Sequence, residues 1–317
     1  MDKTTSNSRY GRTRMFNAIV AAMLGLGFGA TAGRISAQAV KRPSITGIAL
    51  VQIYVTNPKA SEKFYEKELG LAAESSGCNK ELLVCLVLND HQQIQLVEAP
   101  SPVPGNLIAK ITFATPDVEK MRSYLLSKGL KPNAIGASEK GVRHFTLHDP
   151  EGHAVSFVQL PAAKPVGKPA NQISSRIIHA GFIVHDRQAE DHFYEDILGF
   201  HLYWQGGMKD NVTNWVSMQV PDGTDWIEYM LNVGPDASHH SIGIMNHIAL
   251  GVANIQTAKQ ELLRNGGKLT EEPKLGRDGK WQLNVFDPDD TRVEFMEFKP
   301  VEKPCCSEFT GTHPSPQ

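Results

Sequence analysis

The segment FYEDILGF at residues 193–200 decides the fold, because a close copy of it, FYEKELGL, occurs at residues 64–71. A second pair of similar segments, HDPEG from residue 148 and FDPDD from residue 286, is separated by a comparable length of chain. Repeats at a nearly constant separation indicate that the chain is built from duplicated structural units.

Around each copy the chain repeats one order of segments. An extended apolar run is followed by an amphipathic helix that ends at a glycine, and then by strand-like runs separated by turns. In the front half, such units of roughly sixty residues begin near residues 48 and 109. The sequence therefore predicts an α+β fold of four βαβββ modules in two paired-module domains. The expected boundaries are an N-terminal domain at 45–160, a Pro-rich linker at 161–172, a C-terminal domain at 173–299 and a flexible tail at 300–317.

The first 39 residues have the pattern of an export signal. A basic region ends at Arg14, an uncharged run extends from residue 15 to residue 33, and Ala37-Gln38-Ala39 has the small-x-small form of a cleavage site. We expect cleavage after Ala39, a periplasmic or extracellular mature protein, and no stable membrane insertion after cleavage. An uncleaved anchor is the alternative, because the uncharged run is long enough to span a bilayer.

Composition excludes some classes of partner. Of 317 residues, 41% are hydrophobic and 21% are charged, which is a globular composition, and the formal net charge of −2 gives no basic surface for nucleic acid. A small molecule is the expected partner. In an oxidising compartment Cys78 and Cys85 are close enough in sequence for a disulfide, whereas Cys305 and Cys306 lie in the tail and receive no catalytic role.

Four candidate metal ligands each stand alone among apolar residues in strand-like runs of the second half. They are His179 in IIHAGFIV, Glu228 in WIEYML, His247 in MNHIALGV and Glu294 in RVEFMEF. An isolated carboxylate or imidazole is costly to bury unless it is paired or binds a metal. Two imidazoles and two carboxylates suit one divalent ion such as nickel, zinc, iron or manganese.

The four modules, with Phe-Tyr-x-x-x-Leu-Gly closing the first helix of each half, resemble the vicinal oxygen chelate superfamily. This superfamily includes glyoxalase I, bleomycin-resistance proteins and extradiol dioxygenases, and the resemblance covers residues 45–299. It implies that a pair of modules forms a cleft around a metal, with ligands on the first and last strands of each module. Those places hold His179 and Glu228 in the third module, and His247 and Glu294 in the fourth.

Aligning the two halves indicates a single metal site. The residues opposite the four candidate ligands are Leu50, Gln95, Lys110 and Ser156. These are poor ligands for a divalent ion, so the N-terminal domain is interpreted as a degenerate copy.

The order His-Glu-His-Glu resembles glyoxalase I. This resemblance implies a metal-dependent lyase or isomerase that acts on a small metal-chelating carbonyl or hydroxy-carbonyl substrate through a metal-bound enediolate. Glu294 is then the expected catalytic base and Glu228 its partner.

Two alternatives remain open. A type I extradiol-like ring-cleaving dioxygenase would use His179, His247 and Glu294 as ligands, but Asn284 stands where the resemblance implies a Tyr, and Glu228 is an extra ligand. The second alternative is a non-catalytic metal- or ligand-binding protein that has the same cleft.

Overall fold

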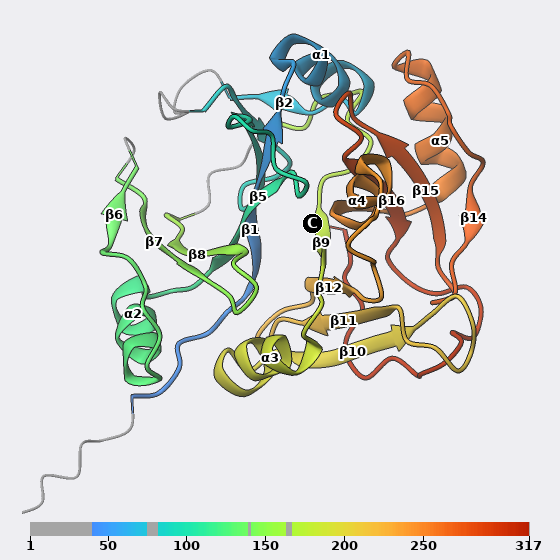
Figure 1. Cartoon of the computed structure of the whole chain (residues 1–317). Coiled ribbons are helices and arrows are strands. Elements are labelled where there is room, and N and C mark those ends of the chain that lie inside the picture. Colours follow the sequence, from blue (N-terminus) through green and yellow to red (C-terminus); the bar gives the residue numbers. More distant parts are fainter. Residues whose placement is uncertain (1–39, 75–81, 139–140, 163–166, 317) are drawn as a thin grey trace, which may run out of the picture. The chain divides into compact units, whose positions relative to one another are not determined.

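The computed structural model describes residues 40–74, 82–138, 141–162 and 167–316 (Figure 1). The predicted signal at residues 1–39 and the predicted partner of Cys85, Cys78, lie outside these ranges. Residues 40–317 form one compact unit, so the boundaries of the two domains stay a prediction. Among the described residues, no helix has the length and apolar character that a membrane crossing requires.

The first sheet is formed by the front half of the chain and has the strand order β2-β3-β4-β1-β5-β8-β7-β6. Its strands are β1 (Gly47–Val55), β2 (Ala72–Ala73), β3 (Val84–Val87), β4 (Gln93–Glu98), β5 (Ile108–Ala114), β6 (Gly136–Ala137), β7 (Arg143–His148) and β8 (Ala154–Gln159). The helical segments of this half are α1 (Pro58–Glu62), the π-helical η1 (Lys63–Glu68) and α2 (Val118–Ser127), which packs on β7 and β8.

The second sheet repeats this order as β10-β11-β12-β9-β13-β16-β15-β14. Its strands are β9 (Ile177–Ile183), β10 (His201–Gly206), β11 (Trp215–Gln219), β12 (Trp226–Met230), β13 (His247–Val252), β14 (Lys274–Leu275), β15 (Trp281–Phe286) and β16 (Arg292–Glu297). The helical segments are α3 (Arg187–Asp191), the π-helical η2 (His192–Ile197), α4 (His239–Met245) and α5 (Ile255–Arg264), which packs on β15 and β16.

Each sheet is two βαβββ modules joined through their first strands. In the front half β1 pairs antiparallel with β5, and in the second half β9 pairs antiparallel with β13. Within every module the first strand pairs parallel with the last. The predicted α+β fold of four βαβββ modules is therefore confirmed.

The repeated Phe-Tyr-x-x-x-Leu-Gly segments form matching corners. In the first copy Tyr65 and Leu69 are fully buried, and Gly70 ends the helical segment with a φ of +74°. That left-handed conformation favours glycine. A Cβ atom on Gly70 would also lie 2.1 Å from the backbone oxygen of Asn171, so this position needs glycine for space as well. Gly199 ends the second copy with a φ of +78°.

The two halves hold each other through reciprocal contacts. The tyrosine of each repeated segment donates a hydrogen bond to the aspartate of the Asp-Pro turn in the other half. These bonds are Tyr65 Oη to Asp287 Oδ2 (3.1 Å) and Tyr194 Oη to Asp149 Oδ2 (3.2 Å). One hydrophobic cluster also contains buried residues from both halves. The duplicated sequence thus produces two equivalent corners between the halves.

Asp225 makes a further link between the halves from a buried position. Its Oδ2 atom accepts a hydrogen bond from Ile48 N (3.0 Å), and its Oδ1 atom accepts two from the Arg176 guanidinium (2.7 and 3.2 Å). Gln92 Nε2 lies 3.4 Å from the same carboxylate. A charge buried at 3% exposure is tolerated here because it is paired and hydrogen-bonded.

The C-terminal segment 300–317 was expected to be a flexible tail, and the structure corrects this through residue 316. Phe309 packs against Tyr203 with tilted rings whose centroids are 4.8 Å apart, and Thr310 N donates to the Tyr203 carbonyl (3.0 Å). Further along, Arg176 donates to the carbonyl of Ser315 (2.7 Å). Aromatic packing and backbone hydrogen bonds order the segment despite its Pro-rich composition. Within it, Cys305 and Cys306 form a disulfide with each other.

We predict that Asp225→Ala lowers the free energy of unfolding by about 3–5 kcal/mol, because it leaves the Arg176 guanidinium buried without its partner. The matched control is Asp222→Ala, which removes a more exposed carboxylate that accepts from Ile45 N and pairs with Arg42. Its expected cost is about 1 kcal/mol. Urea unfolding of both variants measures the difference, and equal costs would contradict the cost assigned to leaving Arg176 without its carboxylate.

Candidate metal centre

The four predicted ligands lie in two neighbouring rows that cross the second sheet. Residues paired across strands point to the same face, and so do residues two apart along a strand. The register places one row as Ser217, Glu228, Gly181, His247 and Arg292. The other row is Trp226, His179, Ala249, Glu294 and Asn284. The topology therefore brings His179, Glu228, His247 and Glu294 to one face.

The donor atoms of these four side chains converge. The Nε2 atoms of His179 and His247 are 3.0 Å apart. Glu294 Oε2 lies 3.5 Å from His179 Nε2 and 3.7 Å from His247 Nε2. Glu228 Oε2 lies 3.9 Å from His179 Nε2 and 3.5 Å from His247 Nε2. Both imidazoles are fully buried, Glu294 is almost so, and the side chain of Glu228 is 13% exposed. Glu228 thus marks the side from which solvent reaches the cluster.

Gly181 makes room for this arrangement. It lies in the middle of its row between Glu228 and His247, and a Cβ atom there would be 2.0 Å from Cε1 of His247. A side chain at this position would displace the imidazole. The small Ala249 occupies the middle of the neighbouring row. The space for a metal is therefore set by two small residues as well as by the ligands.

The front half shows what happens without that space. The strand register there pairs Gln52 with both Gln95 and Lys110, so Gln52 occupies the place that Gly181 has in the second half. Its amide donates to Gln95 Oε1 (2.8 Å) and fills the position between the strands. In the register of the first sheet, Leu50 occupies the position that His179 has in the second sheet. Ser156 likewise occupies the position of Glu294, as the alignment of the halves predicted.

Neighbouring groups orient the ligands. The Nδ1 atom of His247 lies 3.0 Å from the carbonyl oxygen of Met245, which accepts the Nδ1–H and leaves the Nε2 lone pair facing the cluster. Ser217 Oγ donates to Glu228 Oε1 at 3.3 Å, so Oε2 is the atom directed at the imidazoles. Such contacts fix tautomer and orientation in metal sites. Trp226 adds an aromatic wall, with its ring 4.7 Å from that of His179.

Charges around the cluster favour the metal-binding protonation states. Burial acts to raise the pKa of Glu294, but the charge of Arg292 and the contact with His179 outweigh it and hold the pKa at about 2. For Glu228, burial is likewise outweighed by the two histidines, and the pKa is lowered. Burial, followed by the charge of Arg292, lowers the pKa of His247 to about 4. At neutral pH the carboxylates are therefore charged and His247 is neutral.

This donor set fits a divalent ion. Two buried carboxylates and two buried imidazoles, with His179 and His247 nitrogens 3.0 Å apart, need a cation or protons between them. For metal–ligand bonds of about 2.0–2.2 Å, neighbouring ligand atoms are separated by roughly 3.0–3.5 Å. The observed separations of 3.0–3.9 Å are close to that range. Four protein donors leave at most about two positions of a six-coordinate ion for a substrate.

Three further residues belong to the surroundings of the site, and of these the sequence pointed only to Asn284, as the position where the dioxygenase resemblance implies a Tyr. Arg292 carries a positive charge on the same face, and its Nε atom has no hydrogen-bond partner among the described residues. Asn284 lies opposite Glu294, and its amide donates to Glu271 Oε1 (2.6 Å). Lys280 is fully buried behind Trp226, with Nζ 4.6 Å from the ring centroid. For Arg292, the position two residues before Glu294 was a readable signal, whereas Lys280 had none.

Burial lowers the pKa of Lys280 to about 8, although Asp278, Glu228 and Glu294 oppose this shift. Its ammonium group also lies 5.2 Å from the Tyr203 ring centroid and 5.0 Å from that of Phe309. These cation–π contacts connect the C-terminal segment to the wall of the site.

The second half of the chain, which carries the four donors, matches a known family profile. The profile is described as "Glyoxalase/Bleomycin resistance protein/Dioxygenase superfamily", and the match covers residues 176–295. A search of curated protein sequences gives no match.

Solved structures with a similar fold include three bacterial dioxygenases. Homoprotocatechuate 2,3-dioxygenase from Arthrobacter globiformis has a TM-score of 0.63 and 20% identity, with 82% of each chain covered. A variant of the Brevibacterium fuscum enzyme of that name has a TM-score of 0.62 and 21% identity, covering 82% of this chain and 73% of that chain. The 2,3-dioxygenase LapB from Pseudomonas sp. KL28 has a TM-score of 0.63 and 17% identity, covering 87% and 96%. At these identities the likeness establishes the fold alone.

We predict that Gly181→Ala removes about one equivalent of metal per chain, because the new methyl group displaces His247. Metal content by mass spectrometry, with circular dichroism as a check on folding, measures this. The matched control is Gly234→Ala, where an added Cβ meets no atom within 4 Å. Full metal content in folded Gly181→Ala would contradict the role given to this glycine.

Proposed function

We propose that this chain, whose residues 176–295 form a domain of the glyoxalase, bleomycin resistance protein and dioxygenase superfamily, is a single-metal enzyme for a small substrate. The match confirms the superfamily resemblance inferred from the repeats. The observation that carries the proposal is the convergence of two imidazoles and two carboxylates, 3.0–3.9 Å apart and almost wholly buried. The substrate class is a molecule that chelates through two adjacent oxygens, and the ion is nickel, zinc, iron or manganese.

Proton transfer between adjacent carbons is the chemistry that the four-donor set favours. A divalent ion bound there acts as a Lewis acid on a carbonyl oxygen. The structure supports Glu228, rather than Glu294, as the group that moves the proton. Arg292 and His179 lower the pKa of Glu294 to about 2, and the two histidines also lower the pKa of Glu228, so exposure rather than basicity distinguishes the two carboxylates. Glu228 is the most exposed of the four donors, and Ser217 holds only one of its oxygens. This reverses the order expected from the sequence.

Arg292 supports a negatively charged substrate. Its guanidinium lies in the same row as His247, and its Nε–H is unpaired among the described residues. A guanidinium beside the metal ligands is suited to bind a carboxylate of the substrate. An α-hydroxy-carbonyl acid combines the two chelating oxygens with such a charge.

Ring cleavage is the second candidate, and the comparisons favour it over the glyoxalase I-like interpretation, because the structural relatives named above are dioxygenases. His179, His247 and Glu294 form a two-histidine, one-carboxylate set, which is typical of non-haem iron(II) oxygenases. This chemistry requires Glu228 to stay off the ion so that a third position opens. Asn284 is held by Glu271, and it supplies no phenolic proton of the kind that a tyrosine would offer.

Export of the protein is also part of the proposal, on the basis of the basic and uncharged pattern of residues 1–39. Expressed with its own N-terminus in a bacterium, the chain is expected to yield a mature form that begins at Val40. Mass spectrometry of the periplasmic and medium fractions measures this. An intact chain that starts at Met1 and stays with the membranes would show an uncleaved anchor instead.

The roles of the two glutamates are tested together. In the metal-loaded enzyme, Glu228→Gln is expected to retain its metal but to slow exchange of the α-proton of α-hydroxy-carbonyl acids in deuterium oxide by about 10²–10⁴-fold. Glu294→Gln is expected to lose metal, because it removes the most buried carboxylate ligand. Proton nuclear magnetic resonance follows the exchange, and the exposed Glu195→Gln serves as the control.

The same variants distinguish ring cleavage. Protein loaded with iron(II) under anaerobic conditions is mixed with catechol carboxylates, and oxygen uptake is recorded. Oxygen uptake by both the wild type and Glu228→Gln, together with no proton exchange in the wild type, would favour ring cleavage over proton transfer. A protein that shows neither activity with any of the four ions would support a binding protein.

A further inference from the structure

The two equivalent corners between the halves are not chemically equal. At each corner a tyrosine donates to the aspartate of the opposite Asp-Pro turn, Tyr65 to Asp287 and Tyr194 to Asp149. Aligning the two tyrosine segments pairs Glu190 with Ser61, and aligning the two Asp-Pro turns pairs His153 with Thr291. Two positions that hold neutral hydroxyl side chains at one corner therefore hold a carboxylate and an imidazole at the other.

The two hydroxyl residues of the Tyr65 corner are fully buried, and the carboxylate and imidazole that replace them at the Tyr194 corner are buried or largely so. Ser61 and Thr291 have 0% exposure. Glu190 also has 0% exposure, and the side chain of His153 is 19% exposed. The Tyr194 corner thus contains two buried carboxylates, those of Glu190 and Asp149, where the other corner contains one. A second buried carboxylate is costly without a cation or a proton.

The donor atoms at this corner are close enough to share one ion. One ligand atom from each of Asp149, His153 and Glu190 lies within 4.8 Å of the others. His153 Nδ1 is 2.8 Å from Asp149 Oδ2. Glu190 Oε1 accepts the backbone N–H of Glu151 (3.1 Å), whereas its buried Oε2 atom has no hydrogen-bond partner among the described residues. An unpartnered carboxylate oxygen that is wholly buried beside a histidine and a second carboxylate points to a bound cation.

Among the described residues, the basic group in direct contact with these carboxylates is His153, which forms an ion pair with Asp149 only when its ring is protonated. Arg187, at the start of α3, pairs with Asp191 and Gln205 instead. The corner is therefore electrostatically strained whenever both carboxylates are charged and no cation is present.

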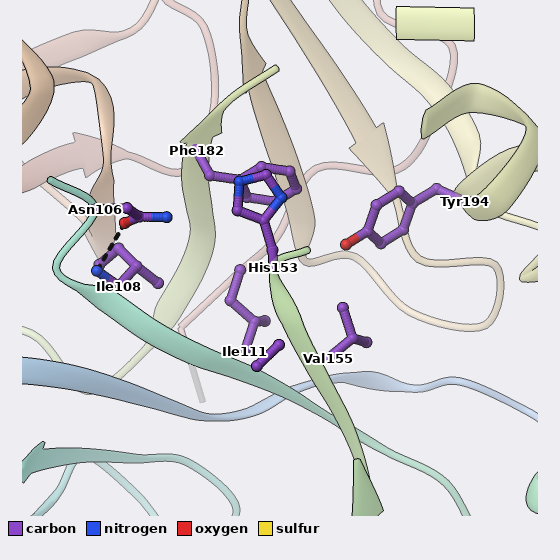
Figure 2. Close-up of a pocket in the computed structure, with 8 residues that line it drawn as sticks. Asn106, Ile108, Ile111, His153, Val155, Phe182 and Tyr194 are labelled. Atoms are coloured by element: carbon purple, nitrogen blue, oxygen red, sulfur yellow. Dashed lines mark hydrogen bonds between the residues drawn. The ribbon is translucent and has the colours of Figure 1, made fainter. Parts of the chain in front are cut away.

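A small pocket borders the cluster at one of its three proposed ligands, His153. Figure 2 shows His153 and Tyr194 at its wall, together with Asn106, Ile108, Ile111 and Phe182. The His153 ring is held against Phe182, with centroids 4.5 Å apart. The pocket has room for about one water molecule or ion.

We propose that Asp149, His153 and Glu190 bind a second divalent first-row ion, at the corner between the halves and apart from the centre formed by His179 and His247. One imidazole nitrogen and carboxylate oxygens form a donor set suited to zinc or manganese. The ion links the Asp-Pro turn of the front half to α3 of the second half, so it stabilises the joint by mass action.

The experiment uses the mature chain with His179→Ala and His247→Ala, which removes the first centre. After dialysis against zinc, this background is expected to retain one equivalent of zinc per chain, and its melting temperature should fall by several degrees when a chelator is added. Adding Glu190→Ser and His153→Thr, which copies the chemistry of the other corner, should abolish both the retained zinc and the response to chelator. Glu190→Gln alone is a milder second variant that keeps the contact to Glu151 N.

Ser61→Ala with Thr291→Val at the other corner is the matched control and should leave zinc binding unchanged. Zinc is counted by mass spectrometry, and melting is followed by fluorescence. The proposal is overturned if the background retains no zinc and manganese gives the same result. It is equally overturned if the retained zinc persists in Glu190→Gln and in Glu190→Ser with His153→Thr. In either case a proton shared by the two carboxylates neutralises this corner.

Discussion

The burial of four ionisable side chains on one face of the second sheet is the constraint on which the account depends. Two carboxylates and two imidazoles withdrawn from water are stable only if a cation or a set of protons neutralises them. The sheet provides the geometry because two adjacent rows of its register carry the four donors. It provides the space because the central positions of these rows are Gly181 and Ala249. Where glutamine replaces the glycine, as in the front half, an amide pair fills the space.

Duplication of the chain explains both what the halves share and where they differ. The repeated Phe-Tyr segment and the Asp-Pro turn make each half hold the other through the same tyrosine–aspartate hydrogen bond. The two sheets differ in the rows that their registers align. One face carries the four candidate ligands, and the equivalent positions of the other hold Leu50, Gln95, Lys110 and Ser156. The corners themselves diverged too, and a charged cluster appeared at Tyr194 but not at Tyr65.

Much of the fold and the meeting of the four candidate ligands could be predicted from the sequence because each left a local signal. The copies at Phe64 and Phe193 predicted the four modules, and single polar residues in apolar strands marked His179 and Glu294. The importance of Gly181 could not be recognised in the same way, because glycines occur in strands for several reasons. The reason here is the His247 side chain of a neighbouring strand, which leaves no room for a Cβ atom.

Features that depend on contacts distant in sequence were missed. The C-terminal segment has a flexible composition, but its Phe309 packs on Tyr203, which lies far earlier in the chain. The charged corner requires Glu190 and His153 to meet across the halves, which the aligned repeats indicate only after the fold is known. The proposed preference for Glu228 over Glu294 as the mobile base rests on the greater exposure of Glu228, which depends on the packing of the folded chain.

The most direct test of the central claim is anomalous diffraction from crystals of the mature, metal-loaded protein, recorded at the absorption edge of the metal found in it. We expect an anomalous peak about 2.0–2.2 Å from the Nε2 atoms of His179 and His247 and from a carboxylate oxygen of Glu294, with Glu228 at or next to the ion. A fully loaded crystal with no peak among these four side chains would contradict it.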